Sequence, residues 1–262
     1  MTRKLKQLRN LVSARRPDLT NEEILALILC GRVHVDGAKA RHPDQSVGAD
    51  AVIELLPARK YVSRGGNKLE PLLLQWKLTV ARKVFIDAGC SKGGFSDCLL
   101  QQGAALVHAV DVGYNQLDYK MRCDSRVKVH EKTNIMLVDP SHFNPRPDAA
   151  VLDLSFRSIR KAAIHVLGML EAKWLLALVK PQFEWLNPDN RFDGVVRSPD
   201  VLYDILVDLI DDLWNERSFV KRIDESPLKG RKGNREFFFL IEGQESTKKK
   251  VIVDRIADLV GK

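Results

Sequence analysis

The feature that most constrains the fold is a strand–loop–helix pattern between residues 84 and 100. A short apolar run starts at Val84 and ends at Asp87, and a segment with helical periodicity follows further on. Three glycines lie between the two: Gly89, Gly93 and Gly94. This order is typical of a buried strand, a tight loop and a helix. Because glycine lacks a Cβ, a ligand can approach the backbone closely there, although an ordinary turn has the same pattern.

A second apolar run, Leu106 to Val110, ends in Asp111. An acid at the end of the second strand, about twenty residues after the loop, can bind a cofactor ribose. The glycine spacing is not G-x-G-x-x-G, and no Gly-Lys-Ser/Thr follows as in a Walker loop. A nicotinamide-dependent oxidoreductase is therefore disfavoured, although Asp111 alone would suit one.

Apolar runs alternate with helical patterns along the rest of the chain. Further strands are predicted at 127–130, 149–153, 174–179, 219–223 and 237–241, and helices at 64–76, 156–170 and 200–214. The alternation predicts an α/β fold with a doubly wound, largely parallel sheet. The last two runs have no helical pattern between them, which favours an antiparallel hairpin at the end of the sheet.

Residues 1–58 form a separate predicted module. A capping box at 20–23 starts a helix that Gly31 ends, and an Asp-Gly turn at 36–37 follows a short strand. The Gly-x-Val-x-Val-x-Gly core at 31–37 resembles the small α+β RNA-binding domain of ribosomal protein S-four, pseudouridine synthases and tyrosyl-tRNA synthetases, without the usual Arg-Leu-Asp start of the opening helix. The resemblance implies phosphate contacts from Lys4, Lys6, Arg15, Arg16, Lys39 and Arg41. A solvated charged face is the alternative.

Charge and cysteine usage narrow the function classes. The formal net charge is +8 and the pI is about 9.3, which makes an anionic partner plausible. The four cysteines show no C-x-x-C pairing and no matching histidine spacing, so we expect free thiols, no zinc site and a reducing compartment. No apolar run approaches a membrane span and no signal peptide opens the sequence. The expected location is the cytoplasm.

Four charged residues stand out: Lys68 lies just before the core of the large domain, Asp153 and Lys180 each end a predicted strand, and Glu236 precedes the last strand. Each alone is most simply a point where the chain meets water. Together they match the K-D-K-E tetrad of the FtsJ-like ribose 2′-O-methyltransferases, and the chain resembles their haemolysin A-type (TlyA) relatives over nearly its full length. The matching stretches are S-R-G-G-N-K-L (63–69), D-A-G-C-S-K-G-G-F-S-D (87–97), A-V-D-V-G-Y-N-Q-L (109–117), E-K-T-N (131–134), D-L-S-F (153–156), L-V-K-P-Q-F-E (178–184) and G-N-R-E-F-F (233–238).

The resemblance implies an S-adenosylmethionine-dependent methyltransferase domain at 64–262, with a Rossmann-like sheet and an antiparallel last strand, joined to the RNA-binding domain by a linker at 59–63. It implies action on ribose 2′-hydroxyls of rRNA, with cytidines in ribosomal subunits as targets. The implied cofactor-binding residues are Asp87, Gly89, Ser91, Gly93, Gly94, Phe95, Asp111 and Asn134, and Arg64 joins the implied RNA contacts. Cys90 and Lys92 stand where relatives often carry Ala and Thr.

The same resemblance makes Lys180 the candidate base for the hydroxyl proton. Lys68 is then a neighbouring cation or a ligand of the hydroxyl, and Asp153 and Glu236 orient the two amines. A lysine acts as a base only when its pKa falls well below its reference value, so the sequence leaves open which lysine has which role. Two other functions stay open: a pore-forming haemolysin, and a non-catalytic RNA-binding protein that would leave the tetrad unexplained.

Overall fold

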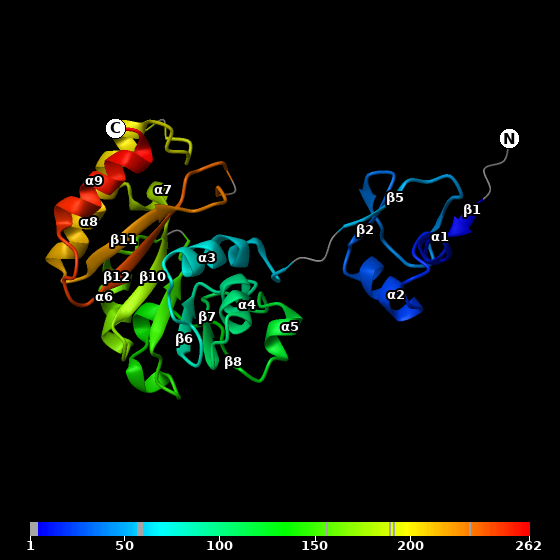
Figure 1. Ribbon diagram of the computed structural model, residues 1–262, viewed down its shortest axis with the longest axis horizontal. Helices are drawn as coiled ribbons and strands as arrows, with labels where there is room; N and C mark the ends of the chain where they lie inside the picture. The colour runs from blue at the N-terminus through cyan, green and yellow to red at the C-terminus, as the bar shows by residue number, and fades with distance from the viewer. Residues whose placement is uncertain (1–4, 57–59, 156, 189, 191, 231) are drawn as a thin grey trace. The chain divides into compact units, whose positions relative to one another are not determined.

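The computed structural model describes residues 5–56, 60–155, 157–188, 190, 192–230 and 232–262 (Figure 1). The chain divides into two compact units, Met1–Arg59 and Lys60–Lys262. Tyr61 and Val62, expected in the linker, instead pack onto the second unit: the Tyr61 ring is buried, and the Val62 N–H donates to Asp97.

The described part of the first unit contains two helices and two small sheets. Thr20 caps the second helix through the predicted capping box, in which Thr20 and Glu23 exchange hydrogen bonds of 2.8 and 3.2 Å. The apolar faces of both helices pack around Val33. The elements are β1 (Leu5–Gln7), α1 (Leu8–Arg15), α2 (Asn21–Leu29), β2 (Val33–Val35), β3 (Ala38–Lys39), β4 (Ser46–Gly48) and β5 (Ile53–Leu55), with β1 paired to β4 and the order β3-β2-β5 in the other sheet.

The described residues of the second unit form a seven-stranded sheet in the order β11-β12-β10-β9-β6-β7-β8. The strands are β6 (Val84–Ala88), β7 (Leu106–Val110), β8 (Val127–His130), β9 (Ala149–Leu152), β10 (Trp174–Val179), β11 (Phe219–Glu225) and β12 (Phe237–Glu242). Neighbours from β8 to β10 run parallel, whereas β12 runs antiparallel to both β10 and β11. The predicted mostly parallel sheet with a C-terminal hairpin is confirmed.

Helices cover both faces of this sheet (Figure 1). One apolar cluster joins the sheet to α6, α8 and α9, and the other joins it to α3 and α4. The helices are α3 (Arg64–Gln75), α4 (Gly94–Gln101), α5 (Tyr119–Arg122), α6 (Arg160–Met169), α7 (Pro181–Glu184), α8 (Pro199–Asn215) and α9 (Lys249–Val260), with short 3-10 turns η1 (Ile135–Leu137) and η2 (Pro140–His142). The sequence prediction missed α9 and began α6 too early: residues 157–159 precede the helix, which starts at Arg160, and Phe156 lies outside the described residues.

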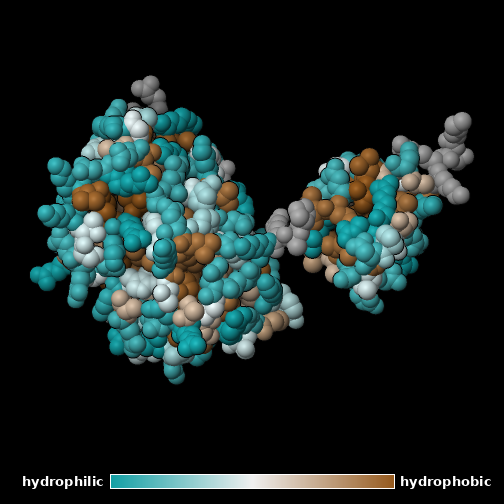
Figure 2. All heavy atoms as spheres, viewed as in Figure 1, coloured by the Kyte–Doolittle hydropathy of each residue, from teal (hydrophilic) through white to brown (hydrophobic). Residues whose placement is uncertain are grey.

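The surface is mixed in character. Figure 2 shows hydrophilic side chains over most of the visible face of the second unit, with smaller apolar patches between them. Among the helices that the structure describes, none combines the length and the apolar character needed to cross a membrane.

Candidate active site

The four charged residues meet at one edge of the sheet. Asp153 directly follows β9, and Lys180 directly follows β10, so both lie at the carboxyl edge of these parallel strands. Glu236 directly precedes β12, which runs the other way and therefore begins at the same edge. The last pair in that register is Val179 with Phe237, so Lys180 and Glu236 are the next residues along.

Each lysine is paired with a carboxylate. Lys180 Nζ lies 2.6 Å from Asp153 Oδ1 and donates to the Leu154 carbonyl at 3.0 Å and to Ser155 Oγ at 2.9 Å. The contact with Asp153 is an ion pair, and the two hydrogen bonds go to the Leu154 carbonyl and Ser155 Oγ. Lys68, from α3, donates to Glu236 Oε2 at 2.5 Å, with only 12% and 4% of the two side chains exposed. Both amines are therefore held in defined positions at the carboxyl edge of the sheet.

The glycine loop between β6 and α4 is part of the same site. Gly89 has a φ of +81°, and a Cβ there would lie 2.6 Å from the Asp153 carbonyl oxygen. Only glycine fits such a left-handed position against another strand's backbone without strain. The close approach brings the loop against the end of β9, next to Asp153, which pairs with Lys180.

Asp111 organises the other side of the loop. Its Oδ2 accepts the Ser91 N–H at 2.8 Å, and its Oδ1 accepts the Gly113 N–H at 2.7 Å. A carboxylate has about four lone-pair sites, so two remain available for hydroxyl groups. Ser91 itself is exposed and has a positive φ of 46°. This arrangement fits a ribose diol beside the loop.

Asp87 is fully buried at the end of β6. Burial raises the pKa of its carboxyl to about 7, and hydrogen bonds from Ser96 oppose that rise. The Ser96 N–H and Oγ both donate to Oδ2, at 2.9 and 2.6 Å, whereas Oδ1 has no hydrogen-bond partner among the described residues. An orphaned buried acceptor costs free energy, and a cationic or N–H group of a ligand would relieve that cost. The loop thus fits a cofactor with an amino group and a ribose.

The other predicted cofactor residues have diverse positions. Gly93 caps the N-terminus of α4 with a φ of 83°, and a Cβ on Gly94 would lie 2.1 Å from Ser63 Oγ. The Phe95 ring is buried in the core, with its centroid 6.0 Å from that of Phe238. Asn134 Oδ1 caps η1 through the Met136 N–H. Gly94 and Phe95 therefore bring α4 against α3 and the sheet, and their contribution to a cofactor site stays a prediction.

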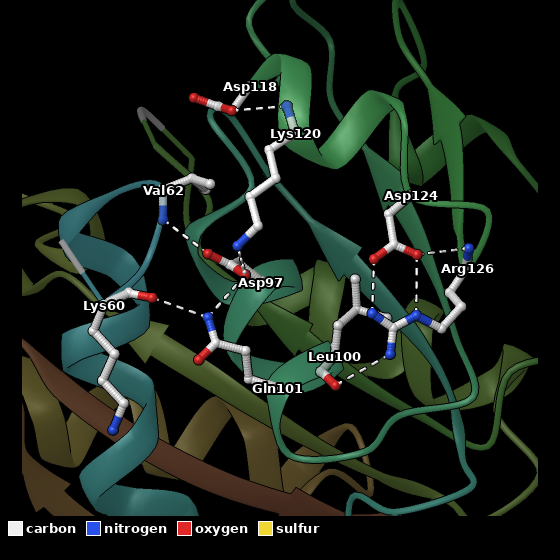
Figure 3. A network of polar contacts seen from close by, with 9 residues as sticks. All are labelled: Lys60, Val62, Asp97, Leu100, Gln101, Asp118, Lys120, Asp124 and Arg126. Atoms are coloured by element: carbon white, nitrogen blue, oxygen red, sulfur yellow. Dashed lines mark hydrogen bonds and ion pairs between the residues drawn. The ribbon is translucent and has the colours of Figure 1, made fainter. Parts of the chain in front are cut away.

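The helix α4 is further anchored by a polar network around Asp97 (Figure 3). The buried Asp97 carboxylate accepts hydrogen bonds from the Val62 N–H at 2.9 Å, Gln101 Nε2 at 3.0 Å and Lys120 Nζ at 3.1 Å. Gln101 Nε2 also donates to the Lys60 carbonyl. The helix behind the glycine loop is consequently tied both to the segment before α3 and to α5.

The predicted RNA contacts lie mostly on the first unit. Lys4 is outside the described residues, whereas Lys6, Lys39 and Arg41 are exposed. Arg15 Nη2 donates to the Ala51 carbonyl, and Arg16 forms a two-pronged pair with Asp18. These two guanidiniums are therefore already engaged within the unit. On the second unit, Arg64 is exposed and Nη2 donates to the Lys229 carbonyl at 3.1 Å.

Three polar residues support the site that sequence reasoning did not single out. Ser155 contacts the Lys180 amine directly. Glu184 binds the loop after β9. Asn234 bridges the Val196 N–H and the Gly194 carbonyl, two residues before Glu236. All three lie inside the quoted motifs, which was the only available signal.

With this geometry in hand, the comparisons with known proteins decide the family. The model of the family described as "FtsJ-like methyltransferase" matches residues 61–242. The chain belongs to this family. The mostly parallel α/β sheet agrees with the resemblance seen in the sequence. The FtsJ-like domain is thus a methyltransferase domain, and it spans most of the second unit.

Relatives of this FtsJ-like chain extend beyond that domain. "Putative rRNA methyltransferase YqxC" of Bacillus subtilis is 39% identical over 254 residues, which are 94% of this chain and 90% of the relative. "16S/23S rRNA (cytidine-2'-O)-methyltransferase TlyA" of Mycobacterium tuberculosis is 34% identical over 228 residues, which are 86% of this chain and 85% of the relative. A solved structure named "Putative hemolysin from Streptococcus thermophilus" has a TM-score of 0.74 at 32% identity, covering 99% of this chain and 96% of its own.

Proposed function

We propose that this chain transfers the methyl group of S-adenosylmethionine to ribose 2′-hydroxyls of ribosomal RNA, with cytidines as targets. The observation that carries the proposal is the pair of lysine–carboxylate contacts at the sheet edge beside the glycine loop. The rRNA and cytidine parts rest on the names of the relatives, which cover most of this chain. We expect such an enzyme to work in the cytoplasm, where ribosomal subunits are found.

Three parts of the chain would hold the cofactor. Asp111 is suited to the ribose diol, the backbone of residues 89–94 to the methionine part, and the unpartnered Asp87 Oδ1 to the amino group. When bound, S-adenosylmethionine supplies an electrophilic methyl group on a positively charged sulfur. Asn134 stays the proposed neighbour of the adenine.

The chain's own residues must then remove a proton from the ribose hydroxyl. A neutral lysine amine donates two hydrogen bonds and offers one lone pair to a hydroxyl. In our proposal Lys180 accepts the proton, while the Leu154 carbonyl and Ser155 Oγ orient its N–H groups. Asp153 then stabilises the ammonium that forms, from 2.6 Å. The Lys68–Glu236 pair places a second cation beside the reacting oxygen, with Glu236 fixing its direction.

RNA affinity is assigned to the basic residues of the first unit and to Arg64. The net charge of +8 favours a polyanion. Lys6, Lys39 and Arg41 are exposed and free to face phosphates in this proposal. Arg64 opens α3, the helix that also supplies Lys68, and therefore suits a phosphate close to the target ribose.

The haemolysin alternative rests on names. "Hemolysin A" of Brachyspira hyodysenteriae is 38% identical over 215 residues. No described contact in this chain favours a pore, whereas methyl transfer accounts for both lysine–carboxylate pairs and for the loop at Gly89. We therefore favour the enzyme over the haemolysin and over a non-catalytic RNA-binding protein.

The test replaces Lys180 and measures single-turnover transfer of tritiated methyl groups from the cofactor to purified ribosomal subunits. Lys180→Ala is expected to lower the rate by about 10²–10⁴-fold, the usual effect of losing an acid–base group. Lys180→Arg should not restore the rate, because a guanidinium stays protonated at working pH.

A matched control removes a lysine–carboxylate pair elsewhere. Lys221 Nζ lies 2.8 Å from Glu242 Oε1, on β11 and β12, and Lys221→Ala should transfer at the wild-type rate. Near-wild-type transfer by Lys180→Arg would exclude Lys180 as the base and make Lys68 the next candidate. Absence of transfer by the wild-type chain to any subunit would refute the proposed function itself.

A further inference from the structure

We propose that Glu184 is a positioning residue for methyl transfer, which acts by holding the loop that carries the partners of Lys180. The assignment rests on the proposed function. Glu184 ends α7, four residues after Lys180, and its side chain is only about 1% exposed. A carboxylate that deeply buried needs a full set of partners, and its partners identify what it holds.

The hydrogen-bond partners of the Glu184 carboxylate among the described residues are Ser158, Ile159 and Arg160, which lead into α6. Oε2 accepts the Ser158 hydroxyl at 2.5 Å and Arg160 Nη1 at 3.0 Å, and Oε1 accepts the Ile159 N–H at 2.9 Å. Arg160 Nη1 also donates to the Glu184 carbonyl at 2.9 Å. Burial raises the pKa of the Glu184 carboxyl, and these donors oppose that rise. One side chain therefore holds three successive residues of another segment.

The segment held in this way leads directly into the site. Asp153, Leu154 and Ser155 contact the Lys180 amine, and among the described residues that follow, Arg157 and Ser158 belong to no helix or strand. The end of β9 fixes this loop on one side, because the Asp153 N–H donates to the Ala88 carbonyl. Glu184 fixes it on the other side. The start of α6 also packs into the core through Ile159 and pairs with Asp212 through Arg160, and Glu184 adds the contacts to Ser158 and to the Ile159 N–H, close to the loop.

The amine and the clamp belong to the same short stretch of chain. Pro181 begins α7 directly after Lys180, and the helix ends at Glu184. The contacts thus form a closed ring that runs from Lys180 to its acceptors, along the loop to Ser158, across to Glu184 and back through α7. A ring of this kind sets the position of the amine relative to Asp153, and a misplacement of about 1 Å at a reacting group can cost about 10²-fold in rate.

A simple structural role is the competing explanation, because Glu184 also caps α6, whose N-cap residue Ile159 has no side-chain cap of its own. The two explanations differ in what a substitution changes. Removing a helix cap lowers the free energy of unfolding. Removing a positioning interaction lowers the rate of methyl transfer once the substrates are bound, and its effect is not additive with that of removing an acceptor of Lys180. Asp148 supplies a matched structural carboxylate: its Oδ2 accepts the Val84 N–H at 2.7 Å, at the opposite edge of the sheet.

The experiment compares Glu184→Gln with Asp148→Asn in the full chain. A glutamine keeps one acceptor oxygen but turns an N–H group toward the donors of α6. We expect Glu184→Gln to lower single-turnover transfer at saturating cofactor and subunits by about 10- to 100-fold, with the cofactor Kd, measured by calorimetry, changed less than about threefold. Asp148→Asn should lower the unfolding temperature and leave the rate unchanged.

A double-mutant cycle with Ser155→Ala separates positioning from stability. If Glu184 acts through the loop, Ser155→Ala should reduce the rate much less in the Glu184→Gln background than in the wild type. Additive effects, or a rate loss no larger than that of Asp148→Asn, would overturn the assignment. Should Glu184→Gln fail to fold, Glu184→Asp keeps the charge and shortens the clamp, and the same criteria apply. Absence of wild-type transfer would overturn the proposed function and this assignment together.

Discussion

Replacing Gly89 by alanine tests the close approach that joins the glycine loop to the end of β9. Two separate costs arise there. A φ of +81° is unfavourable for any residue with a Cβ, and the added methyl group would lie 2.6 Å from the Asp153 carbonyl oxygen and 3.0 Å from its carbon. Both contacts are with backbone atoms, so no flexible side chain can move aside.

The two costs can be separated by magnitude. The left-handed conformation costs about 1–2 kcal/mol for a non-glycine residue. Forcing a methyl group into a packed site adds about 1–3 kcal/mol. We therefore expect Gly89→Ala to lower the free energy of unfolding of the second unit by about 2–5 kcal/mol, the sum of the two costs. The displaced 153–154 peptide directly precedes the Leu154 carbonyl, which accepts a hydrogen bond from Lys180, so methyl transfer should fall as well.

Gly103→Ala is the matched control. Gly103 has a φ of +90°, but its added Cβ would meet only Ala81, at an ordinary 3.5 Å. This variant should lose only the conformational part, about 1–2 kcal/mol. Urea unfolding followed by tryptophan fluorescence measures both variants in the full chain, because all four tryptophans lie in the second unit. Equal losses in the two variants would refute the argument that the Gly89–Asp153 contact excludes a side chain.

Three further predictions concern the cofactor loop and the first unit. Asp111→Ala should weaken S-adenosylmethionine binding in calorimetry, by about 1.5–3 kcal/mol for each charge-assisted hydrogen bond removed; an unchanged affinity would contradict the ribose assignment. Burial raises the pKa of the Asp87 carboxyl from its ordinary 3.8 to about 7, so the folded state holds the extra proton between these values. The free energy of unfolding should therefore fall as the pH rises through this window, and Asp87→Asn should flatten that slope in urea titrations at several pH values; a slope that persists would assign it to another group. Deleting residues 1–58 should preserve cofactor affinity and abolish methylation of subunits. It should also reduce the slope of log K for RNA binding against log salt concentration by about 0.7–0.9 for each phosphate that the protein no longer neutralises. Full-rate methylation by the truncated chain would contradict this division of roles.

Local features of the sequence determined much of the fold. The run from Val84 to Asp87 and the glycines after it specify a strand, a loop and a helix. Both signals are local, because a run of consecutive apolar residues predicts a buried strand and a glycine accepts a positive φ whatever lies elsewhere in the chain. The capping box at Thr20 and the hairpin of β11 and β12 are equally local. The charges that end β9 and β10 also followed from strand boundaries, since parallel strands bring their carboxyl ends to one edge.

Only the tertiary structure decided which groups meet. The strands β1 and β4 are three residues long each and carry no clear alternation, so only their pairing with each other defines them. Lys68 and Glu236 are 168 residues apart, and their contact depends on the antiparallel register of β12 against β10 and on the packing of α3. Glu184 looks like an ordinary surface acid in the sequence, yet it is buried against the start of α6. Such contacts depend on distances between elements, which hydrophobic periodicity and spacing do not encode.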